Sequence, residues 1–169
     1  GDVVLGLASS GPHSNGFSLI RKIVEVSGAS WDMPFDGATL ADRLMEPTRI
    51  YCKQVANVMK KVPIHAMAHI TGGGLVENVP RVLPEGTQVV IHRDSWKRPA
   101  IFDWLQKEGN VAEDEMLRVF NNGIGLVVIV PAEAADAAVS AFESEGEKVY
   151  RLGEVVNRAN AADPGCVVI

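Results

Sequence analysis

The apolar residues of the chain repeat with two different periods, and the period separates strands from helices. Nearly continuous apolar sequence at 3–8 and 126–130 is typical of strands that are covered on both faces. At 19–28, apolar residues recur three and four positions apart with charged residues between them, which predicts an amphipathic helix. By the same criteria we expect strands at 64–70, 87–92 and 148–156, and helices at 51–62, 75–82, 99–107, 113–120 and 132–145.

Capping and helix-breaking residues set the ends of several of these elements. Gly28 is expected to close the first helix, and Thr39 to cap a short helix inside a loop-rich segment. Pro63 ends the next helix, and the helical turns that follow later are expected to break at Pro80 and Pro84. The inward face of the helix before Pro63 is predicted to carry Tyr51, Val55, Val58, Met59 and Val62.

The order of the elements predicts a layered domain of the α/β or α+β class. The tail at 157–169 is expected to add an edge strand or to be loosely held. Hydrophobic residues make up 47% of the 169 residues, which excludes a disordered chain, and two cysteines are too few for a disulfide scaffold. A single domain of this length buries enough surface to fold without a metal or a disulfide.

The charge distribution bears on which partners the protein can have. The net charge is -5, and no run of five like charges occurs, which argues against a nucleic-acid partner. Cys52 and Cys166 lack a CxxC spacing, so we expect no metal site and a reducing compartment. No apolar run approaches the roughly 20 residues that cross a bilayer. We therefore expect a cytoplasmic protein with no membrane partner.

Three loops contain or adjoin half of the 16 glycines. Glycines in such loops let backbone N–H groups converge on an anion, and a following helix N-terminus favours negative charge there. Tight turns are the alternative interpretation of any one loop, but three together favour a ligand that carries phosphate. The glycines are Gly6, Gly11 and Gly16 in the first loop, Gly72 to Gly74 in the second, and Gly123 and Gly125 in the third.

Neither common nucleotide-binding motif fits these loops. The first loop satisfies GxxxxG, but Phe17 stands where a P-loop needs lysine to meet the terminal phosphates. The third loop fails as a dinucleotide fingerprint because Val128 replaces its last glycine and because the segment begins a strand. The loops therefore predict phosphate contact of another kind.

Two histidines stand beside the loops. His13, with Ser14 and Asn15, offers a titratable ring and short polar groups before a helix; the alternative is that Ser14 or Asn15 only caps that helix, which we expect of one of them in any case. His69 ends a strand, where ligands of open α/β sheets collect, and Thr71 follows it. The remaining histidines, His65 and His92, lack such surroundings and are expected to be structural.

Taken in order, these loops resemble those of the aminoimidazole ribonucleotide synthetase family, the phosphoribosylformylglycinamidine cyclo-ligases of purine synthesis. The resemblance covers nearly the whole chain. The segments that carry it are SSG at 9–11, HSNGFSL at 13–19, HITGGG at 69–74, ENVPRVLP at 77–84, FN at 120–121 and GIG at 123–125.

The resemblance implies that the chain is the C-terminal half of a two-domain enzyme. The implied fold is a three-layer α/β/α domain with a mixed sheet, partly ferredoxin-like, occupying residues 1–169. An N-terminal domain outside this chain would hold most of the ATP and Mg²⁺ and the main interface of a homodimer, so this half would need no cofactor of its own. ATP would activate the formyl oxygen of formylglycinamidine ribonucleotide as an iminophosphate, and an amidine nitrogen would then close the imidazole ring.

On this resemblance, His69 is the candidate catalytic residue, as a proton shuttle in the cleft between the domains. The candidate contacts to substrate or phosphate are His13, Ser14, Asn15, Gly16, Thr71, Gly72, Gly73, Gly74 and, more weakly, Asn121. No residue is assigned to a metal. Pro12, Val119 and Asn122 depart from the residues usual in the family, which affects the details of the substrate loops.

Two alternatives remain open from sequence. A sister enzyme of the same two-domain plan, such as thiamine monophosphate kinase, selenophosphate synthetase or a hydrogenase maturation factor, would use similar glycine loops. A non-catalytic domain that binds a phosphorylated ligand belongs to a different class of function. The isolated chain is expected not to turn over substrate.

Overall fold

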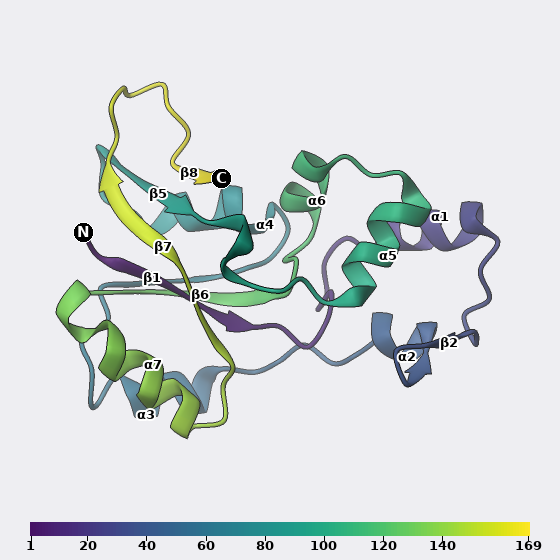
Figure 1. Ribbon diagram of the computed structural model, residues 1–169, viewed down its shortest axis with the longest axis horizontal. Coiled ribbons are helices and arrows are strands. Elements are labelled where there is room, and N and C mark those ends of the chain that lie inside the picture. The colour runs from purple at the N-terminus through teal and green to yellow at the C-terminus, as the bar shows by residue number, and fades with distance from the viewer.

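A computed structural model describes residues 1–169 and contains one large sheet, one small hairpin and seven α-helices (Figure 1). The strands are β1 Val3–Ala8, β2 Pro34–Phe35, β3 Ala38–Thr39, β4 Ala66–His69, β5 Thr87–Ile91, β6 Ile124–Val130, β7 Val149–Asn157 and β8 Cys166–Val168. The helices are α1 Phe17–Ser27, α2 Leu40–Leu44, α3 Cys52–Val58, α4 Gly74–Asn78, α5 Ala100–Gly109, α6 Glu113–Val119 and α7 Ala135–Ser144. Three 3₁₀ turns complete the list: η1 Val79–Val82, η2 Arg93–Ser95 and η3 Ala132–Ala134.

The large sheet contains a ferredoxin-like unit. Its strand order is β4-β6-β1-β7-β5-β8, and every pair is antiparallel except β5 with β8. The chain order β1, α3, β4, β6, α7, β7 gives two crossovers in which parallel strands flank an antiparallel one, which is the split βαβ arrangement. The mixed sheet and the ferredoxin-like part confirm the predicted fold class.

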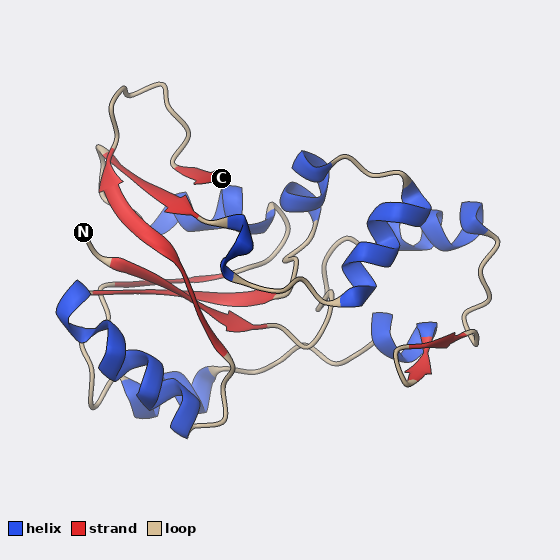
Figure 2. Ribbon diagram, in the orientation of Figure 1, coloured by secondary structure: helices blue, strands red, loops and turns tan.

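Alternation along the two central strands explains why the sheet is covered on both faces. In β1, Val4 packs in one apolar cluster with α4 and η1, whereas Leu5 packs in another with α3 and α7. In β6, Val127 and Val128 divide in the same way, and every residue of this strand is buried. Because successive side chains of a strand point to opposite faces, continuous apolar sequence here requires two covering layers. Figure 2 shows these helices on both sides of the sheet.

A separate group of helices forms a lobe at one end of the sheet. It consists of α1, α2, α5 and α6 with the β2–β3 hairpin, and we call it the helical lobe (Figure 1). Its own apolar cluster centres on Phe102 and Phe120, whose ring centroids lie 6.0 Å apart. The lobe is built from two segments, 9–48 and 92–123, which leave the sheet at the ends of β1 and β5 and return before α3 and β6.

The sheet topology brings three strand ends together next to this lobe. Strands β1 and β4 are each antiparallel to β6, which lies between them, so the ends of β1 and β4 meet the start of β6. Ala8 pairs with Ile124, and His69 pairs with Leu126. The first, second and third glycine loops leave from these three ends.

Most predicted elements are confirmed, with small differences in their bounds. Thr39 caps α2 through a capping box with Asp42, Gly28 follows α1 in the left-handed conformation, and the tail adds β8 as an edge strand. One feature was not predicted: the β2–β3 hairpin, whose turn residues Asp36 and Gly37 both have positive φ. The Asp-Gly dipeptide is the sequence signal for such a turn.

Two predictions about helix ends are wrong. The helix before Pro63 ends at Val58, and Met59 is 54% exposed and does not lie on the inward face. The α conformation is disfavoured for the residue before a proline, here Val62, so the turn between Val58 and Pro63 is not regular α-helix. The N–H of Val62 still donates to the carbonyl of Val58, and its side chain stays buried. Pro80 does not break the chain of turns, because it sits in the first turn of η1, where a missing N–H costs nothing.

Gly74 tests how tightly the second loop is attached to the helical lobe. It has φ +58°, and a Cβ there would overlap the carbonyl oxygen of Leu117 in α6. We expect Gly74→Ala to lower the free energy of unfolding by about 3 kcal/mol, from overlap added to backbone strain. Gly28→Ala has a similar φ of +69° with open space around it, and should cost only about 1 kcal/mol. Equal losses in urea titrations would contradict this explanation.

Candidate functional site

Backbone hydrogen bonds join the three glycine loops at the start of β6. The N–H of Ser9 donates to the carbonyl of Gly123 at 2.9 Å, and the N–H of Ile70 donates to the carbonyl of Gly125 at 2.9 Å. Gly125 also allows close packing, because a Cβ there would overlap the Tyr51 hydroxyl and the ring of His13. The third loop therefore connects the other two.

Asn121 fixes the first loop to the third. It is fully buried, its Oδ1 accepts from the Ser9 hydroxyl at 3.0 Å and from the N–H of Gly123 at 2.8 Å, and its Nδ2 donates to the carbonyl of Gly11 at 2.9 Å. These bonds occupy both ends of the amide with groups of the two loops. The structure thus places Asn121 behind the loops, where it sets their relative position.

His13 is held in one orientation by two backbone donors. Its Nε2 accepts from the N–H of Ser10 at 3.1 Å and from the N–H of Arg49 at 3.4 Å. Since Nε2 accepts, the neutral ring carries its proton on Nδ1, which is buried and has no partner within the protein. His13 has φ +57° and is 4% exposed, so the loop holds an unusual backbone conformation to place this ring.

The surroundings of His13 keep its ring neutral. Burial, and then the nearby charges of His69 and Arg49, lower the pKa of His13 to about 4. His69 itself is exposed at the end of β4 and faces solvent. The other two histidines lie elsewhere: His65 contacts Asp2 at 2.6 Å, and His92 follows β5.

An ion pair with a buried carboxylate and a partly exposed guanidinium anchors the segment that meets His13. The Nε of Arg49 donates to Oε2 of Glu147 at 2.8 Å, and its Nη2 donates to the carbonyl of Gly146 at 3.1 Å. The Glu147 side chain is fully buried, and the Tyr51 hydroxyl nearby donates to the carbonyl of Ala8 at 2.8 Å. Burial and the Glu147 charge raise the pKa of Tyr51. The α7–β7 turn thereby fixes the backbone that donates to His13.

Asn78 organises the second loop. Its Nδ2 lies within hydrogen-bond distance of the carbonyls of Thr71, Gly72 and Gly74 at 3.3, 3.2 and 2.8 Å, and its Oδ1 accepts from the Thr71 hydroxyl at 3.2 Å. The sequence interpretation gave Asn78 no role. The signal for it is one buried amide among apolar residues, a few positions after three glycines.

The predicted polar residues of the first loop have different positions. Ser14 is exposed, with its hydroxyl 3.2 Å from that of Thr48, and Asn15 lies close to Gly72 of the second loop. Neither caps α1, so that prediction is wrong. The N-cap is Gly16, with φ +76° and no side-chain acceptor, because the ring of Phe120 fills the space where a Cβ would lie.

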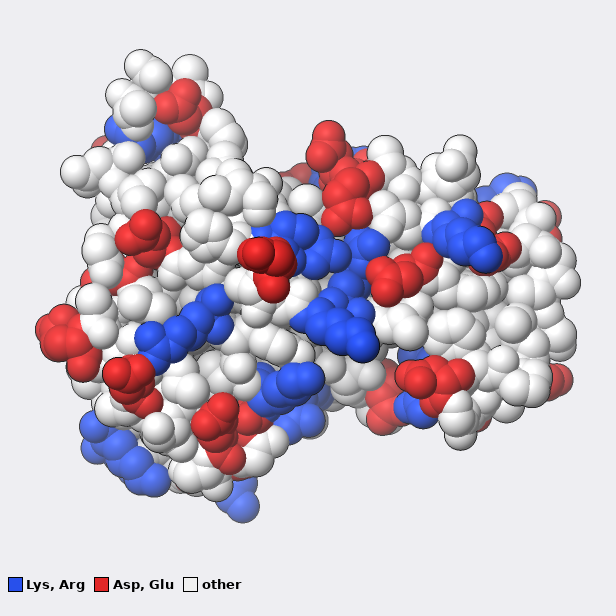
Figure 3. Space-filling view, viewed as in Figure 1, with Lys and Arg blue, Asp and Glu red and all other residues white.

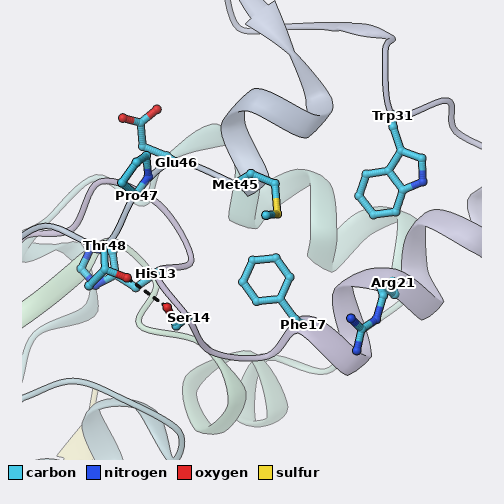
Figure 4. Close-up of a pocket in the computed structure, with 9 residues that line it drawn as sticks. All are labelled: His13, Ser14, Phe17, Arg21, Trp31, Met45, Glu46, Pro47 and Thr48. Carbon is cyan, nitrogen blue, oxygen red and sulfur yellow. Dashed lines mark hydrogen bonds between the residues drawn. The ribbon is translucent and has the colours of Figure 1, made fainter.

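Two cavities open beside these loops. One of about 470 Å³ is lined by His13 and Ser14 together with residues of α1 and of the segment after α2 (Figure 4). The other, of about 390 Å³, is mainly apolar and is lined by His69 and by residues around the start of α3. Thr48 lines both cavities, and sequence reasoning missed it.

Charged groups elsewhere are mixed in sign. On the face drawn in Figure 3, lysines and arginines lie among acidic side chains, and Arg98 pairs with both Asp103 and Glu113. No three side chains of the metal-binding types lie close enough to hold an ion. None of the helices combines the length and the apolar character needed to cross a bilayer.

The low pKa of His13 predicts a dependence of stability on pH. Between about pH 6.5 and pH 4, His13 is protonated in the unfolded chain but stays neutral in the folded protein. The free energy of unfolding therefore falls as the pH falls through this window. We expect this residue to contribute up to about 3 kcal/mol of the loss between pH 7 and pH 4. His13→Asn, which tolerates the same backbone conformation, should lose less over this interval in urea titrations. Parallel losses in both proteins would contradict the assignment.

Replacing Glu147 tests the anchor of the His13 segment. Glu147→Gln leaves the Arg49 guanidinium without its carboxylate, and we expect the free energy of unfolding to fall by about 2 kcal/mol. Glu145→Gln is the matched control in the same turn, because Glu145 bonds to Asn57 and lies 3.9 Å from Lys61 at the surface. It should change stability by less than about 1 kcal/mol. A larger effect from the control would refute the anchoring role.

Solved structures of other proteins share this fold. Thiamine-monophosphate kinase from Stenotrophomonas maltophilia K279a matches 99% of the chain and 50% of its own with a TM-score of 0.66 at 16% identity. A hydrogenase maturation protein HypE in complex with ATP matches 99% of the chain and 47% of its own with a TM-score of 0.65 at 22% identity. At these identities the likeness shows the fold alone.

Other proteins are much more similar to this chain in sequence. Phosphoribosylformylglycinamidine cyclo-ligase of Cupriavidus pinatubonensis (strain JMP 134) is 54% identical over 99% of the chain and 48% of its own length, and the enzyme of that name from Nitrosospira multiformis is 54% identical over 92% and 44%. The chain spans about half the length of these relatives. The model of one family, "AIR synthase related protein, C-terminal domain", matches residues 1–162, and the chain belongs to this family.

Proposed function

We propose that this chain is the C-terminal half of an ATP-dependent phosphoribosylformylglycinamidine cyclo-ligase, which converts formylglycinamidine ribonucleotide to aminoimidazole ribonucleotide, ADP and phosphate. The observation that carries the proposal is 54% identity, over nearly the whole chain, to relatives of that name. The convergence of three glycine loops around one neutral histidine supports it. The sister enzymes share the fold at identities too low to favour their activities.

The two candidate histidines suit different tasks in this reaction. Activation of a formyl oxygen by phosphoryl transfer depends mainly on orientation and on stabilisation of charge. We assign His13 to the substrate because its ring lines the first cavity and is held there, in the neutral form, by the two backbone donors at Nε2. His69, exposed at the mouth of the other cavity, can exchange protons with solvent and so move a proton during ring closure.

The loop residues supply contacts of a second kind. We assign Ser14, Asn15 and Gly16 to the substrate, together with Thr71 and Gly72 to Gly74 of the second loop, which lies close to Asn15. Asn121 contributes by holding the first loop in place and not by direct contact, because its amide bonds to Ser9, Gly11 and Gly123.

ATP and Mg²⁺ belong to the part of the enzyme outside this chain. The donor set here does not fit a magnesium site, since no cluster of three carboxylate, histidine or cysteine side chains exists. We therefore derive no step through a metal from these residues. The longer enzyme is proposed to be a cytoplasmic homodimer that acts on small molecules, and this half by itself to need no cofactor.

Histidine substitutions in the longer enzyme test the assignment. We expect His13→Asn and His69→Asn to reduce kcat about 100-fold or more, because the first removes the ring that lines the cavity and the second removes a proton carrier. His65→Asn and His92→Asn serve as controls and should stay near wild type. Steady-state rates of ADP release measure this, with circular dichroism to check folding. Similar rates in all four variants would rule out the roles given to His13 and His69.

The chain of 169 residues is expected to show no cyclisation by itself. The nucleotide must meet an activating phosphoryl donor, and we place the site for that donor outside these residues. The measurement is formation of the aminoimidazole product after mixing the chain with substrate and Mg-ATP. Adding the N-terminal half in trans is the positive control, and turnover without it would refute the division of labour.

A further inference from the structure

The segment between α2 and α3 borders both cavities, and we call residues 46–50 the α2–α3 link. Its first three residues line the cavity of His13, and its last three line the cavity of His69. Thr48 is the one residue that lines both. Figure 4 shows its side chain beside His13, with a hydrogen bond that joins its hydroxyl to that of Ser14.

The link is not held by backbone pairing. None of its residues belongs to a helix or a strand, and none takes part in a hydrogen bond between two backbone groups. Backbone donors and acceptors that lack such partners pair with side chains or with water. The position of the link therefore depends on bonds that involve side chains.

Those bonds go to the first loop. Three successive residues of the link each meet a different residue of that loop, and the third is also held at its side chain by Glu147. The contacts run from the Ser10 hydroxyl to the Pro47 carbonyl at 2.6 Å, between the hydroxyls of Ser14 and Thr48 at 3.2 Å, and from the Arg49 N–H to Nε2 of His13 at 3.4 Å. The link and the first loop therefore fix each other's position.

The Ser14 hydroxyl depends on Thr48 for its direction. Ser14 is exposed, Thr48 is half-buried, and the contact between them is the only hydrogen bond that either side chain makes. Without this contact the serine side chain would be free to move among its rotamers. A hydroxyl carries one proton and accepts at two positions, so when Thr48 donates to Ser14, the Ser14 proton stays available to an oxygen of a ligand.

The next residue of the link connects this hydroxyl to the ring of His13. Thr48 and Arg49 are adjacent, and the side chain of the first meets Ser14 while the backbone of the second meets His13. A displacement of the link would therefore move both groups of the first loop. This arrangement gives Thr48 a task beyond lining the two cavities.

We propose that Thr48 is a positioning residue of the proposed reaction, which orients the Ser14 hydroxyl toward the substrate in a fixed relation to the His13 ring. The inference rests on the proposed function for the identity of the substrate and for the contact that Ser14 makes with it. It adds a residue whose hydroxyl acts through another hydroxyl and not on the substrate itself.

The test is a double-mutant cycle in the longer enzyme. Thr48→Val keeps the branched shape that borders both cavities and removes only the hydroxyl, and it should lower kcat/KM about tenfold. Thr48→Ser restores the hydroxyl and should stay within about twofold of wild type. Ser14→Ala should cost as much as Thr48→Val, and the double variant should cost no more than either single one, because both remove the same contact.

Thr87→Val is the matched control. Thr87 is also half-buried, and its hydroxyl makes one hydrogen bond, to the Pro84 carbonyl at 2.6 Å. It begins β5 and lines neither of the two cavities, so kcat/KM should stay unchanged. Circular dichroism and urea titrations check that each variant is folded under the conditions of the assay.

Several outcomes would overturn the proposal. Losses that add up in the double variant would show that Thr48 acts independently of Ser14. No loss from Thr48→Val, no recovery in Thr48→Ser, or an equal loss from Thr87→Val would also reject the positioning role. The proposed function fails separately, because a wild-type longer protein without cyclo-ligase activity would reject the reaction itself.

Discussion

The candidate site depends on the position of β6 between β1 and β4. Because β6 runs antiparallel to both neighbours, the ends of β1 and β4 and the start of β6 coincide, and three loops that are far apart in sequence leave from one place. Backbone hydrogen bonds at the start of β6, from Ser9 to Gly123 and from Ile70 to Gly125, hold the loops in this register. The site is thus a consequence of strand order more than of any single loop.

The sequence predicts the types of the elements and the presence of the loops, but not how the loops come together. Element types followed from periodicity, because β6 is buried on both faces and α1 has one apolar side. The three loops could be recognised as glycine clusters, and His13 and His69 stood out beside them. Their convergence could not be derived locally, because it requires the pairing of β6 with β1 and β4, and no pattern within a strand specifies its neighbours.

The residues that sequence reasoning missed hold other residues of the site in position. Asn78, Arg49 and Glu147 lie in apolar or charged stretches that look ordinary, and their roles appear only when distant carbonyls and side chains are brought near them. The cap of α1 was wrong for a related reason: Ser14 and Asn15 are good capping residues, but contact between Gly16 and Phe120 of another segment decides the geometry. Local propensity yields to tertiary packing at these positions.

The ion pair between Arg49 and Glu147 gives the α7–β7 turn an influence beyond its own surroundings. The turn holds the Arg49 side chain, while the backbone N–H of the same residue meets His13. The pKa of His13 in the first loop therefore depends on a turn at Glu147, 134 positions further along the chain. Anyone who redesigns that turn, for solubility or for fusion to another protein, is also adjusting the acid–base character of the loop.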